Sequence, residues 1–325
     1  GDLIDSYRPG GINNGNVSKE DYDENSDIII LKISVYLDKK ATTYGDRLII
    51  IIGNHELMNV FGNLDYVSKK GIDGFENYKD PNNPNMKFSD GHEARTHAFK
   101  PGNEYATLLG CNSYPAVIVG SSLYVHAGII DKLMTYLNIT KKTFSEINKN
   151  IRLWLLGLLD KKYVVKILES SDISMFWTRI LGTIPPGVPF EDPRCSDNLT
   201  DVLKILEVGN MFIGHTPQSF KYSSDINSTC GDKIWRVDMG SSKAFNKFDP
   251  DYIKHGKKNH GRRAQWLKII NDEEFYTCDI DGCRKYNIKK SNVNVDTNSM
   301  CKNNMCNKDN HVYDYETNRF FIIFF

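Results

Sequence analysis

Residues 48–56 read LIIIIGNHE, a run of five apolar residues followed by a glycine and three polar residues. The apolar run predicts a β-strand that is buried on both faces, as strands are in sheets covered by helices. Such sheets bind ligands at the carboxyl ends of their strands. Gly53 allows the chain to turn sharply there, so we expect Asn54, His55 and Glu56 to lie in a loop at a binding site.

The three polar side chains after Gly53 suit a site for a divalent cation and a phosphate group. Asn54 offers a neutral carbonyl oxygen as a ligand, His55 can act as a ligand or a proton donor, and Glu56 can orient either of them. An ordinary polar turn has the same composition, and four residues alone do not separate the two interpretations.

Two further apolar runs end in a histidine next to a glycine. They are LYVHAG at residues 123–128 and MFIGHTP at residues 211–217, which contain His126 and His215. The chain also opens on GDLID, with Asp2 and Asp5 three residues apart. A single histidine beside an apolar run is usually a core residue. Three histidines that each follow a strand, with an aspartate and an asparagine in matching places, form the dispersed ligand set of a two-metal hydrolase.

The order of these motifs resembles the phosphoprotein phosphatase branch of the calcineurin-like metallophosphoesterases. Four segments resemble the Shewanella-like protein phosphatases in particular: GNHELMNV at 53–60, WTR at 177–179, GHTPQ at 214–218 and WRVDMGSS at 235–242. The resemblance runs from Gly1 to about Phe275 in the family's motif order. It implies an α/β fold, a β-sandwich of mixed sheets flanked by helices.

The resemblance also implies a metal centre. Asp2 matches the carboxylate that bridges two divalent ions, and Asn54, His126 and His215 match the other ligands of the second ion. These ligand types suit Mn, Fe and Zn alike, so the identity of the metal stays open.

Three more residues match the family's catalytic groups. His55 matches the histidine that protonates the leaving group, with Asp5 as the carboxylate that orients it. Arg179 is the expected phosphate-binding arginine, because a guanidinium pairs bidentately with phosphate oxygens. Asp5 could instead cap a turn, and Arg179 could be a surface ion-pair residue. Ser6 stands where many relatives have a phosphate-binding arginine, and Arg8 is the candidate substitute.

The resemblance implies a phosphoprotein phosphatase that hydrolyses Ser/Thr or Tyr phosphomonoesters by direct attack of a metal-bridging hydroxide. Two alternatives stay open, namely a metallophosphoesterase of nucleotides or other small molecules, and a non-catalytic binding module. The family's first motif, an Asp-x-His on a preceding strand, has no counterpart after Gly1, so the domain reads as N-terminally truncated. One metal site then keeps only Asp2, which leaves open whether the chain as written is active.

We expect residues 1–287 to form the catalytic domain, lacking its first strands and first metal motif. Residues 288–325 are rich in Asn, Lys and Asp and predict a low-complexity, disordered tail. Helical spacing predicts helices within residues 27–40, 104–109, 143–159 and 199–206. Strands are predicted at residues 116–119, 123–125, 211–213, 234–239 and 265–270.

Composition excludes several classes of partner. Lys+Arg and Asp+Glu balance at 41 each, so no charge excess points to nucleic acid or an anionic membrane. No apolar run reaches the roughly 18 residues of a transmembrane segment. We expect phosphoprotein substrates and a soluble, by default cytoplasmic protein, with a preceding targeting segment unreadable from this sequence.

The seven cysteines are an odd number spread along the chain, which favours reduced thiols over a disulfide framework. Cys278 with Cys283, and Cys301 with Cys306, repeat a Cys-x4-Cys spacing. We interpret them as unrelated cysteines, with a zinc site as the alternative.

Overall fold

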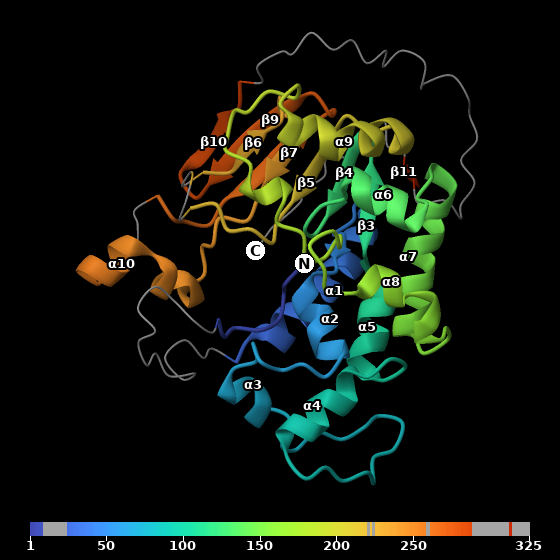
Figure 1. Ribbon diagram of the computed structural model, residues 1–325. Coiled ribbons are helices and arrows are strands. Elements are labelled where there is room, and N and C mark those ends of the chain that lie inside the picture. The colour runs from blue at the N-terminus through green and yellow to red at the C-terminus, as the bar shows by residue number, and fades with distance from the viewer. Residues whose placement is uncertain (9–24, 220–221, 223–224, 258–260, 288–311, 314–325) are drawn as a thin grey trace.

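The computed structural model describes residues 1–8, 25–219, 222, 225–257, 261–287 and 312–313 (Figure 1). Its strands are β1 (Ile50–Ile51), β2 (Ser113–Tyr114), β3 (Ala116–Val119), β4 (Ser122–Val125), β5 (Asn210–Ile213), β6 (Asn227–Thr229), β7 (Ile234–Arg236), β8 (Trp266–Ile270), β9 (Glu274–Asp279), β10 (Gly282–Lys285) and β11 (Val312–Tyr313).

The α-helices are α1 (Asp27–Thr42), α2 (Asn54–Val60), α3 (Lys69–Asp73), α4 (Gly91–Phe99), α5 (Glu104–Asn112), α6 (Asp131–Leu137), α7 (Lys141–Leu155), α8 (Val165–Leu168), α9 (Pro193–Leu206) and α10 (Pro250–His255). The short 3₁₀ helices in the described part of the chain are η1 (Lys161–Tyr163), η2 (Leu181–Thr183) and η3 (Lys243–Phe248).

Among the described residues the strands form three sheets. The largest is a mixed six-stranded sheet in the order β11-β3-β4-β5-β7-β6, in which β4, β5 and β7 run parallel to one another. A three-stranded antiparallel sheet has the order β10-β9-β8, and β1 pairs with β2 in a two-stranded parallel sheet. The chain is therefore an α/β protein with mixed sheets, as predicted.

Side chains of the six-stranded sheet alternate between two hydrophobic cores, because successive residues of a strand point to opposite faces. One face packs on the helices, with α6, α7 and α9 along it (Figure 1). Its strand residues include Leu123, Val125, Met211, Ile213 and Ile234. The other face packs on β8 and β9 and makes the sandwich, through Val117, Tyr124, Phe212 and Trp235.

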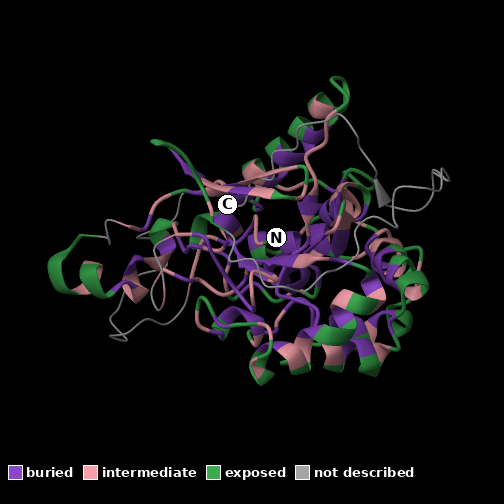
Figure 2. Cartoon of the chain, turned by 90° about the horizontal axis from the view of Figure 1, so that it is seen from above, coloured by how far each residue is buried: buried purple, intermediate pink, exposed green. Residues whose placement is uncertain are grey.

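Aromatic rings fill the core between the two sheets. Phe212 is 1% exposed and stacks on Tyr124, with ring centroids 4.7 Å apart. Trp235 stacks on Phe275 of β9 at 4.7 Å. Figure 2 shows buried residues running through the middle of the molecule, with exposed residues on the outer helices. This core holds β4, β5 and β7 in place from behind.

Most predicted elements are present, with three corrections. The run at 48–52 is not a strand buried on both faces, since only Ile50–Ile51 join a ladder and Ile49 and Ile51 are half-buried. Within the described residues β1 has a strand neighbour on one edge only, so less of the run is covered. The predicted helix at 143–159 ends at Leu155, and Leu158, inside the predicted range, is 71% exposed. Gly157 follows the helix with a φ of 71°, which turns the chain away.

The third correction concerns the cysteines. Two disulfides, Cys195–Cys230 and Cys278–Cys283, contradict the expectation of reduced thiols, and the second pair is a hairpin crosslink instead of half a zinc site. Folding brings Cys195, at the start of α9, against the turn after β6, a contact between residues 35 positions apart. Cys111 is the free cysteine among the described residues.

The described residues contain no helix long and apolar enough to cross a bilayer. The predicted tail at 288–325 lies outside the described residues except for Val312–Tyr313, which pair with β3. The division of the chain at residue 287 stays a prediction.

The aromatic core can be tested by the variant Phe212→Ala. Removing a fully buried ring leaves a cavity between the sheets, so we expect the free energy of unfolding to fall by about 3–5 kcal/mol. Chemical denaturation measures this. Tyr44→Ala is the control, since Tyr44 is 74% exposed and its loss should change stability by less than about 0.5 kcal/mol. Equal effects of the two variants would contradict the assignment of this core.

Candidate metal centre

Two histidines reach one site because they follow neighbouring parallel strands. His126 comes directly after β4, and His215 follows β5 with Gly214 between them. The Gly214 amide donates to the His126 carbonyl at 2.8 Å, which ties the two loops together. The carboxyl ends of parallel strands share one edge of a sheet, so both side chains enter the same space.

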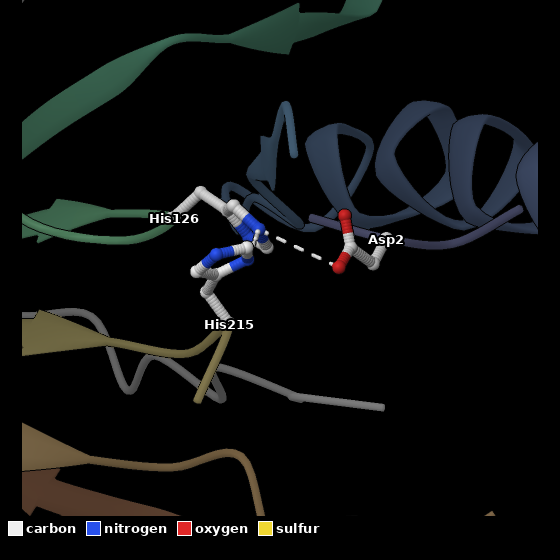
Figure 3. Close-up of side chains that lie close together, drawn as sticks. All are labelled: Asp2, His126 and His215. Atoms are coloured by element: carbon white, nitrogen blue, oxygen red, sulfur yellow. Dashed lines mark hydrogen bonds and ion pairs between the residues drawn. The ribbon is translucent and has the colours of Figure 1, made fainter. Parts of the chain in front are cut away.

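Ligand-type atoms from three residues converge on the His126 ring. Its Nε2 lies 2.8 Å from Asn54 Oδ1, 3.1 Å from His215 Nδ1 and 3.4 Å from Asp2 Oδ2. Asp2, His126 and His215 face one another (Figure 3), and their ligand atoms all lie within 4.8 Å of one another. One ring nitrogen carries at most one proton and cannot satisfy three such partners, whereas a cation can bind all four side chains at once. The donor set therefore fits a divalent metal.

The surroundings leave both histidines able to act as ligands. Burial lowers the pKa of His126 well below its ordinary value. Burial, followed by the charge of Arg179, lowers the pKa of His215 to about 4. The Nε2 of His215 lies 3.1 Å from the Trp177 carbonyl, and a proton there turns the lone pair of Nδ1 toward the site. Neutral imidazoles are the form that binds metals.

Asp2 is the anionic member of the cluster. Its burial tends to raise the pKa of its carboxyl, but the charges of His126 and His55 outweigh that effect and lower it. Asp2 and His215 have φ values of 61° and 63°, a left-handed conformation that is rare for residues other than glycine. Such backbone strain gathers at functional sites, where surrounding contacts must hold it.

The GNHE segment was predicted to form a loop, and this prediction is wrong. The segment forms the start of α2. Gly53 is the N-cap and Glu56 occupies the third helical position, where its carboxylate accepts from the Gly53 amide at 2.6 Å. The same carboxylate accepts from the amides of Asp2 at 2.9 Å and Leu3 at 2.6 Å. Glu56 thus fixes the segment that carries Asp2 against the start of α2. Burial, followed by the charge of Asp2, raises the pKa of Glu56.

Gly53 is required for a close approach of two segments. A Cβ at this position would lie 2.1 Å from Asp2 Oδ1, too close for any side chain. The absence of a side chain therefore allows Asp2 to sit beside α2.

His55 and Asp5 form a buried pair beside the metal ligands. His55 Nδ1 lies 2.9 Å from Asp5 Oδ2, and the opposite ring nitrogen, Nε2, lies 3.9 Å from Asp2 Oδ2. The Asp5 side chain has no exposed area. Asp5 therefore binds Nδ1 of the His55 ring, while Nε2 faces the candidate metal centre.

Two arginines border the site. Arg179 is exposed, and its Nη1 donates to the His215 carbonyl at 2.7 Å. Arg8 donates through Nη1 to the Asp5 carbonyl at 2.7 Å, and it lines a cavity of about 510 Å³ together with Asp2, His126 and His215. All the residues predicted for the site therefore lie in or next to it.

Sequence reasoning missed several residues that support the site. Asn59, Arg95 and Asp27 form a buried hydrogen-bonded group behind Asp5. Asp238 accepts from the Gly240 amide at 2.9 Å and lines the cavity. Asn59 lies one helical turn beyond His55, and that i, i+4 spacing was the available signal.

The chain has relatives among known proteins. No protein-family model matches the chain. The chain is 32% identical to uncharacterized protein R398 of Acanthamoeba polyphaga mimivirus, over 74% of this chain and 94% of that protein. It is 25% identical to Shewanella-like protein phosphatase 2 of Arabidopsis thaliana, over 76% of this chain and 66% of that one. It is 28% identical to Shewanella-like protein phosphatase 1 of Plasmodium berghei, over 70% and 57%.

A solved structure shares the fold. The cold-active protein-tyrosine phosphatase of a psychrophilic Shewanella species superposes with a TM-score of 0.54 at 19% sequence identity, over 80% of this chain and 64% of that one. The fold is the calcineurin-like α/β fold of that phosphatase. The chain belongs to one family with protein R398, and its sequence resembles the Shewanella-like protein phosphatases of the phosphoprotein phosphatase branch. It spans about two thirds or less of the length of these named phosphatases.

The metal centre can be tested with the variant His126→Ala. Because the His126 ring contacts all three other candidate ligands, we expect the Kd for Zn²⁺ or Mn²⁺ to rise by more than about 100-fold. Isothermal titration calorimetry measures this. His92→Ala is the matched control, since His92 is exposed on α4 and its loss should leave affinity unchanged. Unaltered binding by His126→Ala would place the metal elsewhere.

Proposed function

We propose that this chain is a metal-dependent phosphoprotein phosphatase that hydrolyses phosphomonoesters by direct attack of water on phosphorus. The observation that carries the proposal is the position of the His55–Asp5 pair, 3.9 Å from the carboxylate that completes the candidate metal centre. A divalent ion bound there supplies Lewis-acid activation of water and phosphate. Mn, Fe and Zn, as one ion or two, are all compatible with these ligand types.

In this proposal, Asp2, Asn54, His126 and His215 hold the metal, and Glu56 keeps Asp2 in place. The attacking water forms a new phosphorus–oxygen bond and releases a proton to solvent as the bond to the leaving oxygen breaks. His55 gives the proton on Nε2 to that leaving oxygen, so no alkoxide has to depart unprotonated. Asp5, bonded to Nδ1, keeps Nε2 facing the substrate.

Arg179 and Arg8 are the proposed phosphate-binding groups. Each has one nitrogen bonded to a backbone carbonyl of a site residue, which anchors the guanidinium beside the metal centre. The remaining donors of such a guanidinium suit the non-bridging oxygens of a phosphate.

Phosphotyrosine is the first substrate to test, because the solved structural neighbours are named as protein-tyrosine phosphatases. Phosphoserine and phosphothreonine peptides come next. Comparing kcat/KM for these peptides with that for nucleotides separates a protein phosphatase from a small-molecule metallophosphoesterase. A chain that binds metal and phosphopeptide but releases no phosphate from any ester would be a non-catalytic binding module.

The role of His55 predicts the effect of His55→Asn. Loss of the proton donor should lower kcat for a phosphoserine peptide by about 10²–10⁴-fold and leave metal affinity unchanged. Phosphate release in the presence of Mn²⁺, with a chelator blank, measures turnover. His92→Asn, on the surface, is the control and should behave as the parent chain. Equal turnover by His55→Asn and the parent would remove His55 from the mechanism.

A further inference from the structure

A buried arginine lies behind the proposed proton donor. Arg95 belongs to α4 and has no exposed area, and its guanidinium lies 5.3 Å and 5.2 Å from the ring centroids of Phe75 and Phe99. It does not line the cavity that contains the metal ligands. A charge buried this deeply is costly unless it is paired and hydrogen-bonded.

The partners of Arg95 connect it to the site. Its Nε donates to Asn59 Oδ1 at 2.9 Å, its Nη2 donates to Asp27 Oδ2 at 2.8 Å, and its Nη1 donates to the Gly71 carbonyl at 3.2 Å. The same Nη2 lies 3.6 Å from Asp5 Oδ1. One guanidinium therefore stands between two buried carboxylates, one of which is bonded to His55.

These contacts fix the orientation of the Asn59 amide. A guanidinium only donates, so the Asn59 oxygen must face Arg95 and the Asn59 nitrogen must face the other way. That nitrogen donates to Asp5 Oδ1 at 2.9 Å and to the His55 carbonyl at 3.0 Å. Asp5 Oδ1 is thereby occupied, and Oδ2 is left to bind His55 Nδ1 at 2.9 Å.

The chain of contacts also holds a strained conformation. Asp5 has a φ of 73°, in the left-handed region. Bonds to both of its carboxylate oxygens hold the side chain in that conformation. With Arg95 removed, Asn59 could rotate its amide, present its oxygen to Asp5 and repel the carboxylate.

We propose that Arg95 is a positioning residue for the reaction, which acts through Asn59 and Asp5 to hold the His55 ring with Nε2 facing the leaving group. The inference rests on the proposed function, since it assigns a support to the proposed proton donor. Arg95 touches neither substrate nor metal, and Asp27 completes the pairing of its charge. The structure thus extends the pair His55–Asp5 into a buried row of five side chains, ending Asn59–Arg95–Asp27.

Leaving-group dependence separates positioning from general stability. An ester of an acidic phenol, such as 2,4-dinitrophenyl phosphate, needs no proton on departure, whereas phosphoserine does. We expect Arg95→Lys to lower kcat for a phosphoserine peptide at least 10-fold, with KM unchanged, and to lower kcat for the dinitrophenyl ester less than 2-fold. Arg236→Lys is the matched control, because Arg236 is also fully buried (1% exposed) but bonds to Ile184, Asn227 and Ser228 away from His55. It should show no change in the ratio of the two rates.

A double-mutant test checks whether Arg95 acts through Asn59. If Arg95 acts through Asn59, then Arg95→Lys should change the ratio of rates no further in an Asn59→Leu background. Additive effects of the two substitutions would overturn the proposed route.

If Arg95→Lys does not fold, Asp27→Asn, which keeps the side-chain shape, replaces it. We expect Asp27→Asn also to lower kcat for the phosphoserine peptide more than kcat for the dinitrophenyl ester.

A second measurement does not depend on turnover. In protein labelled with ¹⁵N-histidine, the proton on His55 Nδ1 should give a slowly exchanging NMR signal, which is assigned by its absence in His55→Asn. We expect Arg236→Lys to keep this signal and Arg95→Lys to lose or shift it. An unchanged signal in Arg95→Lys would overturn the inference. A parent chain that shows the signal but hydrolyses no phosphate ester would instead contradict the proposed function alone.

Discussion

The parallel pairing of β4 with β5 determines the geometry of the candidate metal centre. The register Leu123↔Met211 and Tyr124↔Phe212 brings the ends of the two strands level, so that His126 and His215 leave the sheet side by side. A shift by one residue would turn every side chain of β5 to the opposite face and separate the two histidines. The stacked rings of Tyr124 and Phe212 hold that register from the sandwich side. Stability and the proposed activity therefore depend on the same strand contact.

The carboxylate of Glu56 brings the other two candidate ligands, Asp2 and Asn54, to the two histidines. Glu56 accepts hydrogen bonds from the amides of Asp2, Leu3 and Gly53, and so joins two segments more than 50 residues apart. Because Glu56 is buried, a nearby amide left without a hydrogen-bond acceptor would cost free energy. This cost favours the one arrangement in which all three amides point toward the Glu56 carboxylate. The GNHE motif is thus a structural clamp as well as a source of Asn54 and His55.

Much of the site was predictable because its signals are local. A polar residue one or two positions after an apolar run marks the end of a strand, and this rule singled out Asn54, His126 and His215 as candidates. The helical start at Asn54 was missed, although a glycine followed three residues later by Glu56 is a helix-start signal. Arg95 and Asp27 carry no such signal, since they lie 68 residues apart and meet only after folding. The disulfide Cys195–Cys230 escaped prediction for the same reason, because sequence spacing does not report distance between separate elements.

The central claim is that Asp2, Asn54, His126 and His215 bind one divalent ion. Anomalous X-ray diffraction at the zinc edge, from crystals of this chain grown with Zn²⁺, tests it most directly. The account predicts a zinc peak about 2.0–2.2 Å from the four ligand atoms. A peak at other side chains with this cluster empty, or no peak at all, would contradict it.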